Sequence, residues 1–370
     1  MTARADRVAG MVAALAVLLA ILTLILWSDG MSSDPGASPS ATTARPMAVL
    51  GDSNSHSYQD YVWFPADSTE RGGPLRSRTF QWTEVLARLR GTELDPGPRV
   101  QWGRPGVVAR AREWLGLRGG RAPKKDDYLY NFANSGAACK NLMGGRFRQA
   151  PRLVALMNED PKRWERGVVI IRIGLNNWGG LLDLQAQDPN APELARVTAY
   201  CKGEIADAIT LIHASHPSTR ILVVGIGNEA DDPANFDRWQ SATETANIRI
   251  ALDSFNAALR QLAEGHPRVA FFDDAKWFER LWGARSVDGK PEYRTVTVGS
   301  SLHVSNTAGD DPHNALLEDH HPGLVWNAIW AQALVARLNQ AFGLSLTPIS
   351  DREVEDFLGP LVGAPKAPGS

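Results

Sequence analysis

The chain has 370 residues, two cysteines and a formal net charge of −2, with 22% charged and 44% hydrophobic residues. This composition is typical of a globular protein and excludes a disordered or fibrous chain. A net charge near zero gives no electrostatic basis for binding nucleic acid. Two cysteines are also too few for a disulfide framework or a four-cysteine zinc site.

Arg4 and Arg7 precede an uncharged, strongly apolar stretch over residues 8–27. About twenty helical residues span the roughly 30 Å of a bilayer core, whereas a cleaved signal peptide has an apolar region of only about 7–15 residues. We therefore favour residues 1–7 as a cytoplasmic basic stub and residues 8–27 as an uncleaved transmembrane anchor, with a cleaved signal peptide as the alternative. The rest of the chain is then exported to the periplasmic or extracytoplasmic side. A start at Met31 would remove this anchor.

Three further segments are expected after the anchor. Residues 28–46 are rich in Ser, Pro, Gly and Ala, which is typical of a flexible linker. Residues 47–345 are expected to form one globular domain, and residues 346–370 a C-terminal extension.

Short apolar runs alternate with amphipathic segments throughout the expected domain. Near-continuous apolar runs are typical of parallel strands that are covered on both faces. The alternation predicts an α/β fold, a three-layer α/β/α sandwich of flavodoxin-like type around a mostly parallel five-stranded sheet. The expected strands are 47–50, 128–133, 168–174, 220–227 and 269–273. The expected helices are 80–91, 147–158, 193–215, 243–264 and 323–341.

Polar motifs stand where the expected strands end, and ligands bind at that edge of a parallel sheet. Each motif alone is common in turns, but together they converge on one edge. The motifs are GDSNS at 51–55 after the first strand, NSGA at 134–137 after the second, GLNN at 174–177 after the third, and EDHHP at 318–322 before the last helix.

This order of motifs resembles the SGNH/GDSL hydrolase superfamily, over about residues 47–342. The resemblance implies acyl-ester hydrolysis through a covalent acyl-enzyme, with no cofactor and no metal. Ser53 would be the nucleophile, expected at a helix N-terminus whose dipole favours negative charge. The backbone N–H groups of Ser53 and Gly136 and the side-chain amide of Asn176 would form the oxyanion hole.

The acid–base part departs from the family pattern, in which an Asp precedes the His by three residues. His321 is preferred as the base over His320, because Leu317 stands three residues before His320. Glu318 lies three residues before His321, and Asp319 lies two before it. Either carboxylate could orient His321, or neither does and the site is a Ser/His dyad.

Four further residues of the strand-end motifs are candidates for binding substrate. They are Asp52, Asn54, Asn177 and Trp178. Trp178 follows the Asn176 motif, and its ring could stack on a sugar.

Three other features leave alternatives open. The acidic and His residues between 310 and 321 match no standard zinc or calcium spacing, so no metal site is expected. His56 is expected to face solvent in the first turn of a helix, with a place in the site as the alternative. Cys139 and Cys201 lie in the exported part, where a disulfide is permitted, and either a disulfide or two separate thiols is consistent with the sequence.

The resemblance and the predicted anchor together imply an exported, membrane-tethered serine esterase that acts on an acyl ester. By analogy with the family, acetyl groups of cell-envelope or extracellular polysaccharide are the expected substrate. The expected partners are an acylated small molecule or glycan and the membrane. One alternative is a polysaccharide O-acyltransferase with the same Ser/His site, in which a sugar hydroxyl replaces water. Another is a glycan-binding protein without catalytic activity.

Overall fold

The computed structural model describes Thr23 and residues 43–363. Apart from Thr23, the expected stub and anchor over residues 1–27 and the linker up to residue 42 lie outside the described residues, as does the end of the chain after residue 363. Among the described helices, none combines the length and apolar character needed to cross a bilayer.

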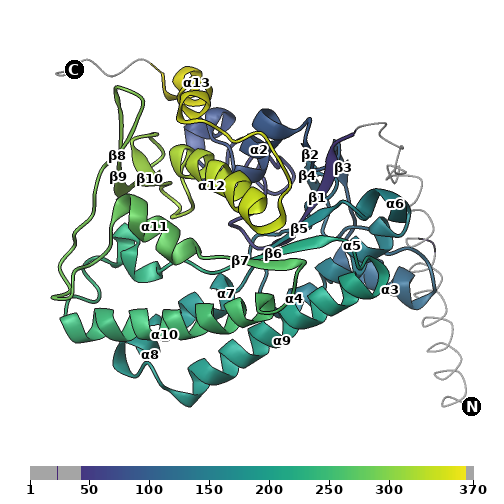
Figure 1. The fold of residues 1–370 in the computed structure, drawn as a ribbon, viewed down its shortest axis with the longest axis horizontal. Helices are drawn as coiled ribbons and strands as arrows, with labels where there is room; N and C mark the ends of the chain where they lie inside the picture. The colour runs from purple at the N-terminus through teal and green to yellow at the C-terminus, as the bar shows by residue number, and fades with distance from the viewer. Residues whose placement is uncertain (1–22, 24–42, 364–370) are drawn as a thin grey trace, which may run out of the picture.

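A parallel five-stranded sheet forms the centre of the molecule (Figure 1), in the order β2-β1-β5-β6-β7. Its strands are β1 (Arg45–Gly51), β2 (Leu94–Asp95), β5 (Val168–Arg172), β6 (Arg220–Val224) and β7 (Val269–Phe272). The register pairs Gly51 with Arg172, Arg172 with Val224, and Val224 with Phe272. Four strands therefore end level, and the turns that follow them start from one edge.

The prediction that residues 128–133 form a strand of this sheet is wrong. Its first residue belongs to β4 (Lys125–Tyr128), which pairs antiparallel with β3 (Arg99–Trp102). The rest touches β1 only through an isolated bridge between Asn131 and Val49. A turn in which Asn131 N–H donates to Tyr128 O interrupts the apolar run, and the short β2 takes the edge position beside β1.

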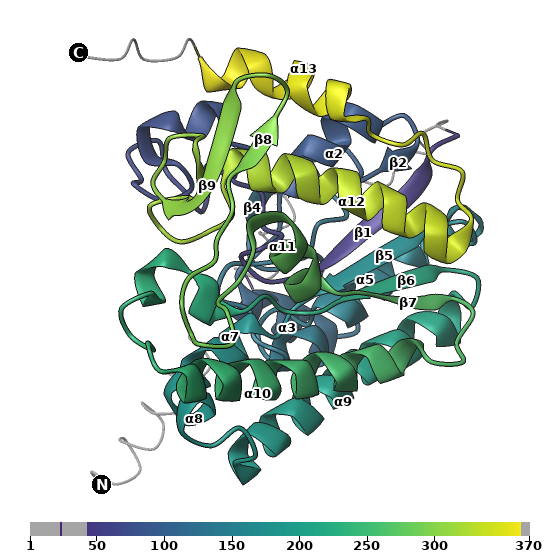
Figure 2. The same ribbon diagram turned by 60° about the vertical axis from the view of Figure 1, so that its left-hand side comes forward.

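Helices cover both faces of the sheet, which makes the predicted three-layer sandwich (Figures 1 and 2). Ala48 and Leu50 of β1 join the core on the face covered by α5, α9 and α10. Met47 and Val49 alternate with them and join the core under α2, α11, α12 and α13. This period of two is that of a strand buried on both faces. The helices are α2 (Trp82–Arg90), α5 (Gln149–Met157), α9 (Pro192–Ser215), α10 (Ala242–Arg260), α11 (Asp274–Trp282), α12 (Leu324–Phe342) and α13 (Asp351–Val362).

The expected C-terminal extension contributes a helix to the domain. Ser350 accepts a hydrogen bond from Glu353 N–H, and the Glu353 side chain accepts one from Ser350 N–H, which is a capping box that starts α13. Val354 and Leu358 of α13 are buried in the core beneath α12. The domain therefore extends at least to Val362.

Shorter elements complete the fold and carry several site segments. A three-stranded sheet of order β10-β9-β8 lies directly before the acid–His motif in the chain. Its strands are β8 (Val296–Val298), β9 (Leu302–Ala308) and β10 (Asn314–Leu316). The short helices are η1 (Gly73–Arg78), α3 (Gly106–Trp114), α4 (Lys140–Met143), α6 (Pro161–Trp164), α7 (Leu175–Trp178), η2 (Gly179–Leu181), α8 (Leu182–Gln187), η3 (Glu229–Asp231), η4 (Pro233–Asn235) and η5 (Gln261–Ala263).

Candidate active site

A cavity of about 370 Å³ lies at the carboxyl ends of the parallel strands. This is the place where ligands bind in open α/β sheets. Segments that follow β1, β5, β6 and β10 all contribute to its wall. The residues on which the argument depends are Ser53, Asn54, Arg172, Asn176, Glu229, Asp319, His320 and His321.

Ser53 lies in a tight turn directly after β1 and is partly exposed to the cavity. Gly51 is required before it, because a Cβ atom there would come within 2.5 Å of Arg172 O. The expected helix N-terminus at Ser53 is wrong: residues 52–55 form a bend and a turn, and the first α-helix after them, α2, begins only at Trp82. The insert between them separates the nucleophile turn from that helix.

Asp52 shapes this turn and is not available to a substrate, which corrects its expected role. Its side chain is buried, and Asp52 Oδ1 accepts a hydrogen bond from Asn54 N–H at 3.0 Å. Burial raises the pKa of Asp52 to about 6, against the lowering effects of that hydrogen bond and of Arg172. Asn54 lines the cavity, and Asn54 O accepts from Trp82 Nε1 at 3.0 Å and from an Arg172 nitrogen at 2.9 Å. The turn is thus held from three sides.

His321 and Asp319 lie together at the cavity wall. His321 Nδ1 is 3.2 Å from Asp319 Oδ1 and 2.9 Å from Asp319 O. Glu318 is exposed, and its carboxylate makes no hydrogen bond or ion pair with any described residue. His320 has a φ of 62° and directs its Nδ1 to Asp232 Oδ1 at 3.0 Å. Of the two open carboxylates, the structure therefore brings Asp319 to His321.

Arg71 is a site residue that sequence reasoning missed. Its guanidinium pairs with the Asp319 carboxylate, and its backbone N–H donates to Asp319 Oδ2 at 2.9 Å. Burial raises the pKa of Asp319, but His321 and Arg71 outweigh this effect and hold the pKa well below its usual range. Arg71 lies some 250 positions from His321 along the chain, in an insert without a recognisable motif, so no local signal could have indicated it.

Two groups compete for His321 Nδ1. An Arg71 nitrogen lies 2.8 Å from it, and because guanidinium only donates, this contact requires an unprotonated Nδ1. The oxygens of Asp319 instead favour a protonated Nδ1, which leaves Nε2 free to accept a proton. To act as a base through Nε2, His321 requires the tautomer in which Nδ1 carries the proton.

The expected oxyanion groups come from three segments, those that contain Ser53, Gly136 and Asn176. Asn176 lines the cavity, and its Nδ2 donates one hydrogen bond to Ala137 O at 2.8 Å, which leaves a second N–H available. Gly136 is exposed, has a φ of 73°, and does not line the cavity itself. The backbone N–H groups of Ser53 and Gly136 donate to no acceptor within residues 43–363. Both N–H groups are therefore unpaired, and of the two residues only Ser53 lines the cavity.

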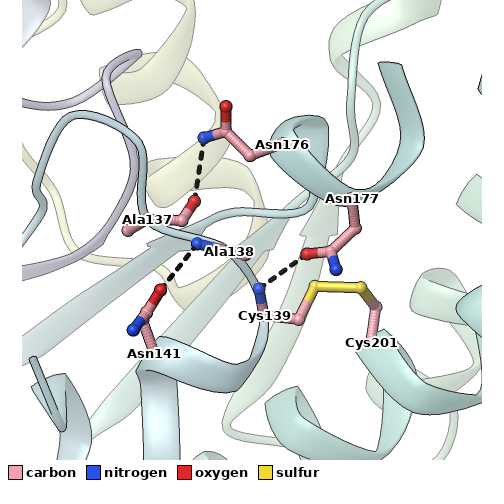
Figure 3. The surroundings of a disulfide bond; sticks show 7 residues. All are labelled: Ala137, Ala138, Cys139, Asn141, Asn176, Asn177 and Cys201. Carbon is pink, nitrogen blue, oxygen red and sulfur yellow. Dashed lines mark hydrogen bonds between the residues drawn. A yellow bond between two sulfur atoms is a disulfide. The ribbon is translucent and has the colours of Figure 1, made fainter. Parts of the chain in front are cut away.

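A disulfide between Cys139 and Cys201 ties the Gly136 loop to α9 (Figure 3). The pairing that the sequence left open is therefore present. Asn177 Oδ1 accepts a hydrogen bond from Cys139 N–H at 2.7 Å beside it. Asn177 thus braces the loop instead of contacting substrate, which corrects its expected role.

The prediction that the Trp178 ring stacks on a sugar is wrong. It is 2% exposed, and its ring packs against Phe255 with the centroids 4.7 Å apart. The single helical turn of α7 directs Trp178 into the core while Asn176 stays at the surface. Aromatic side chains of Phe278 and Trp326 line the cavity instead.

His56 is buried, so its expected solvent-facing position is also wrong. Its Nε2 is 2.8 Å from Asp60 Oδ2, and its Nδ1 is 3.1 Å from both Ser135 Oγ and Ser135 N. His56, Asp60 and Asp127 form the one trio with metal-ligand spacing among the described residues. Asp127 already pairs with Lys125 Nζ at 2.7 Å, so an ammonium group takes the charge that a metal would supply.

Comparisons with known proteins add the following findings. No protein-family model matches the chain, and no curated protein matches it. Among solved structures, it is similar to the lipase Lip_vut3 from a goat rumen metagenome, with 12% identity, a TM-score of 0.38, and coverage of 83% of this chain and 100% of that one. It is also similar to an extracellular lipase from Streptomyces rimosus, with 17% identity, a TM-score of 0.41, and coverage of 80% and 100%.

A third similar structure is described as a putative GDSL-like lipase from Parabacteroides merdae. It shares 15% identity with this chain at a TM-score of 0.40, with coverage of 82% of this chain and 98% of that one.

Proposed function

We propose that this chain is a serine esterase of the SGNH/GDSL type that hydrolyses an acyl ester at the cavity beside Ser53. The observation that carries the proposal is the shared cavity wall: Ser53, Asn176 and an Asp319–His321 pair line one cavity at the carboxyl edge of the sheet. A hydroxyl nucleophile, a base with an orienting carboxylate, and amide donors are the groups that acyl transfer needs.

In the proposed mechanism, Ser53 Oγ attacks the ester carbonyl while His321 Nε2 takes the hydroxyl proton. Within residues 43–363, no hydrogen bond yet joins Ser53 Oγ to His321, and such contacts often form only with substrate bound. Asp319 accepts from Nδ1–H and stabilises the imidazolium. Free N–H groups of Ser53 and Gly136 and the Asn176 amide receive the oxyanion.

The alcohol then leaves with the proton from His321, and the acyl-enzyme remains on Ser53. Water enters, His321 accepts its proton, and the carboxylic acid departs as Ser53 regains its hydrogen. The cavity wall combines carboxyl and amide groups with a few apolar side chains, among them Phe278 and Trp326, and the substrate we propose is a polar ester with a short acyl group such as acetyl. An acetylated glycan is a substrate of this kind.

The proposal includes export and tethering by residues 8–27. The disulfide between Cys139 and Cys201 supports export, because disulfides persist in oxidising compartments and are rare in the cytosol.

The full chain and its Ser53→Ala variant test the proposal. Wild type should release p-nitrophenol from p-nitrophenyl acetate and react with a fluorophosphonate probe, and Ser53→Ala should do neither. Ser55→Ala is the matched control in the same turn, since Ser55 Oγ faces Trp82 Nε1 at 3.3 Å in the core. An unreactive wild type, or a labelled Ser53→Ala variant, would contradict the proposal.

A further inference from the structure

One part of the cavity wall presents hydrogen-bond acceptors. It consists of Glu229, Asp231, Asp232 and Asn306, which we call the acceptor wall. The first two belong to η3 and Asp232 follows them, while Asn306 comes from the distant strand β9. Two separate elements thus bring acceptors to the cavity that Ser53 lines.

Two side chains of the acceptor wall have no partner for their acceptor atoms within the described part of the chain. Asn306 is 4% exposed; its Nδ2 donates to Asp231 O at 2.8 Å, but its Oδ1 accepts nothing. The Glu229 carboxylate likewise has no hydrogen bond or ion pair with any described residue. A buried acceptor without a donor, such as Asn306 Oδ1, is costly and rare in folded proteins, whereas Glu229 is partly exposed at the cavity wall. A bound group that donates hydrogen bonds is the simplest complement of both.

The charge of the cavity is also unbalanced. Five carboxylates line it. Arg172 pairs with Asp274 at 2.7 Å and Arg71 pairs with Asp319, but no cation among the described residues pairs with Glu229. Burial and the nearby negative charges of Asp232 and Asp52 raise the pKa of Glu229 to about 7. A cation beside Glu229 would remove this cost, whereas a phosphate or carboxylate there would add to it.

The remaining members of the wall are already engaged and fix its shape. Asp231 Oδ1 accepts from Tyr293 Oη at 2.8 Å, and the charges of Arg249 and Arg285 also reach Asp231. Asp232 Oδ1 faces His320 Nδ1 at 3.0 Å. Glu229 and Asn306 are therefore the two members of the wall whose side-chain oxygens have no hydrogen-bond donor among the described residues.

We propose that the acceptor wall binds a protonated amine in the alcohol portion of the ester, an inference that rests on the esterase function proposed above. A hydroxyl group would also donate to Asn306 Oδ1, but only an ammonium group both donates and balances the charge of Glu229. The substrate class is then an acyl ester of an amino alcohol or amino sugar. Binding involves no covalent step beyond the ester chemistry at Ser53.

A matched pair of acetate esters tests the proposal on the full chain. 2-(Dimethylamino)ethyl acetate and 3-methylbutyl acetate have nearly the same shape, and the first carries a protonated amine near neutral pH. We expect kcat/KM to be at least about ten-fold higher for the amino ester, the size of one hydrogen bond to a charged group. In Glu229→Gln the ratio should fall to about one, while Asp237→Asn, an exposed carboxylate in the same segment, should keep the wild-type ratio.

The outcomes separate this inference from the esterase proposal. An active wild type with equal rates for both esters, or an unchanged ratio in Glu229→Gln, overturns the acceptor-wall assignment. If wild type hydrolyses no ester, the esterase proposal fails, and calorimetric titration with 2-(dimethylamino)ethanol and with 3-methylbutan-1-ol tests the acceptor wall by itself. Binding of the amino alcohol alone, and its loss in Glu229→Gln, would support the acceptor wall. Absence of binding by both alcohols overturns it. Thermal unfolding of each variant checks that the fold is intact.

Discussion

The molecule contains two Ser–His–Asp arrangements that share residue types but differ in surroundings. We call them the cavity set and the inner set. The cavity set is Ser53, His321 and Asp319, and the inner set is Ser135, His56 and Asp60. The inner set has the more continuous hydrogen bonds, with the imidazole 3.1 Å from the hydroxyl oxygen and 2.8 Å from the carboxylate. Hydrogen-bond geometry alone would therefore select Ser135 over Ser53 as the nucleophile.

The two sets differ in their access to solvent and in the ability of their histidine to accept a proton. The cavity set lines open space, whereas His56 and Asp60 are fully buried. His56 Nδ1 already accepts a hydrogen bond from Ser135 N–H, so its lone pair is engaged. Burial, together with the positive charges of Lys125 and Arg71, lowers the pKa of His56. A base must be able to gain a proton during the reaction, and both the burial of His56 and the engaged lone pair on its Nδ1 disfavour this in the inner set.

Arg71 connects the two sets. One guanidinium nitrogen is 2.8 Å from His321 Nδ1, and another donates to Ser135 Oγ at 3.3 Å. Ser135 directly precedes Gly136, one of the expected oxyanion donors. We therefore interpret the inner set as a support that positions the loop next to the cavity set.

The largest expected effect tests which carboxylate orients His321 in the cavity set. Asp319→Asn should lower kcat by about 10²–10⁴-fold, because the amide no longer stabilises the imidazolium or fixes the reactive tautomer. Glu318→Gln should change kcat less than about two-fold, since this exposed side chain has no contact with His321. Steady-state kinetics on p-nitrophenyl acetate measures both. Equal losses in the two variants, or a loss only in Glu318→Gln, would reverse the assignment.

A smaller effect tests the supporting role of the inner set. Ser135→Ala removes the hydroxyl between His56 and Arg71 and should lower kcat about ten-fold with KM unchanged, a fraction of the 10²–10³-fold cost of losing an oxyanion donor. Fluorophosphonate should still label Ser53, because the nucleophile remains.

Ser57→Ala is the control for losing a hydroxyl from the same buried network. Ser57 Oγ donates to Asp127 Oδ1 at 2.5 Å and does not reach the cavity. This variant should lower the unfolding temperature but leave kcat unchanged. A loss of labelling in Ser135→Ala would instead assign the nucleophile to the inner set.

The sheet could be predicted wherever a strand is buried on both faces. The runs at 168–174 and 220–227 are almost entirely apolar because both faces of β5 and β6 meet helices. By contrast, β2 has two residues and carries no periodic signal. The apolar run at 128–133 misled the prediction because a polar turn at Asn131 breaks it.

The candidate site was predictable in its motifs but not in the burial of its members. Ser53, Asn176 and His321 stand in short segments that the edge of the sheet brings together. Trp178 and Asp52 stand in the same segments, yet one helical turn or one hydrogen bond directs them away from the cavity. Sequence spacing does not encode these directions, and it gives even less indication of Arg71, whose contacts depend on a distant insert and a backbone φ of 58°.

The smallest expected effect is a pH dependence of stability that belongs to the inner set. In the folded chain the pKa of His56 lies well below its ordinary value of 6.5, mainly because of burial and also because of Lys125. Below about pH 6.5, the unfolded chain therefore binds a proton at this residue that the folded chain does not. The free energy of unfolding should fall as the pH falls through this range, by at most about 1.4 kcal/mol per pH unit from one such group.

Denaturant unfolding between about pH 8 and pH 5 measures this slope in wild type and in His56→Gln. Glutamine keeps a donor for Asp60 and an acceptor for Ser135 N–H but does not titrate, so its curve should be flatter in acid whatever its stability at neutral pH. His213 and His216, whose pKa values burial also lowers, contribute equally to both proteins and cancel in the difference. Parallel curves would mean that His56 gains a proton in the folded state as readily as in the unfolded state. The inner set could then also act as a base, and this difference from the cavity set would disappear.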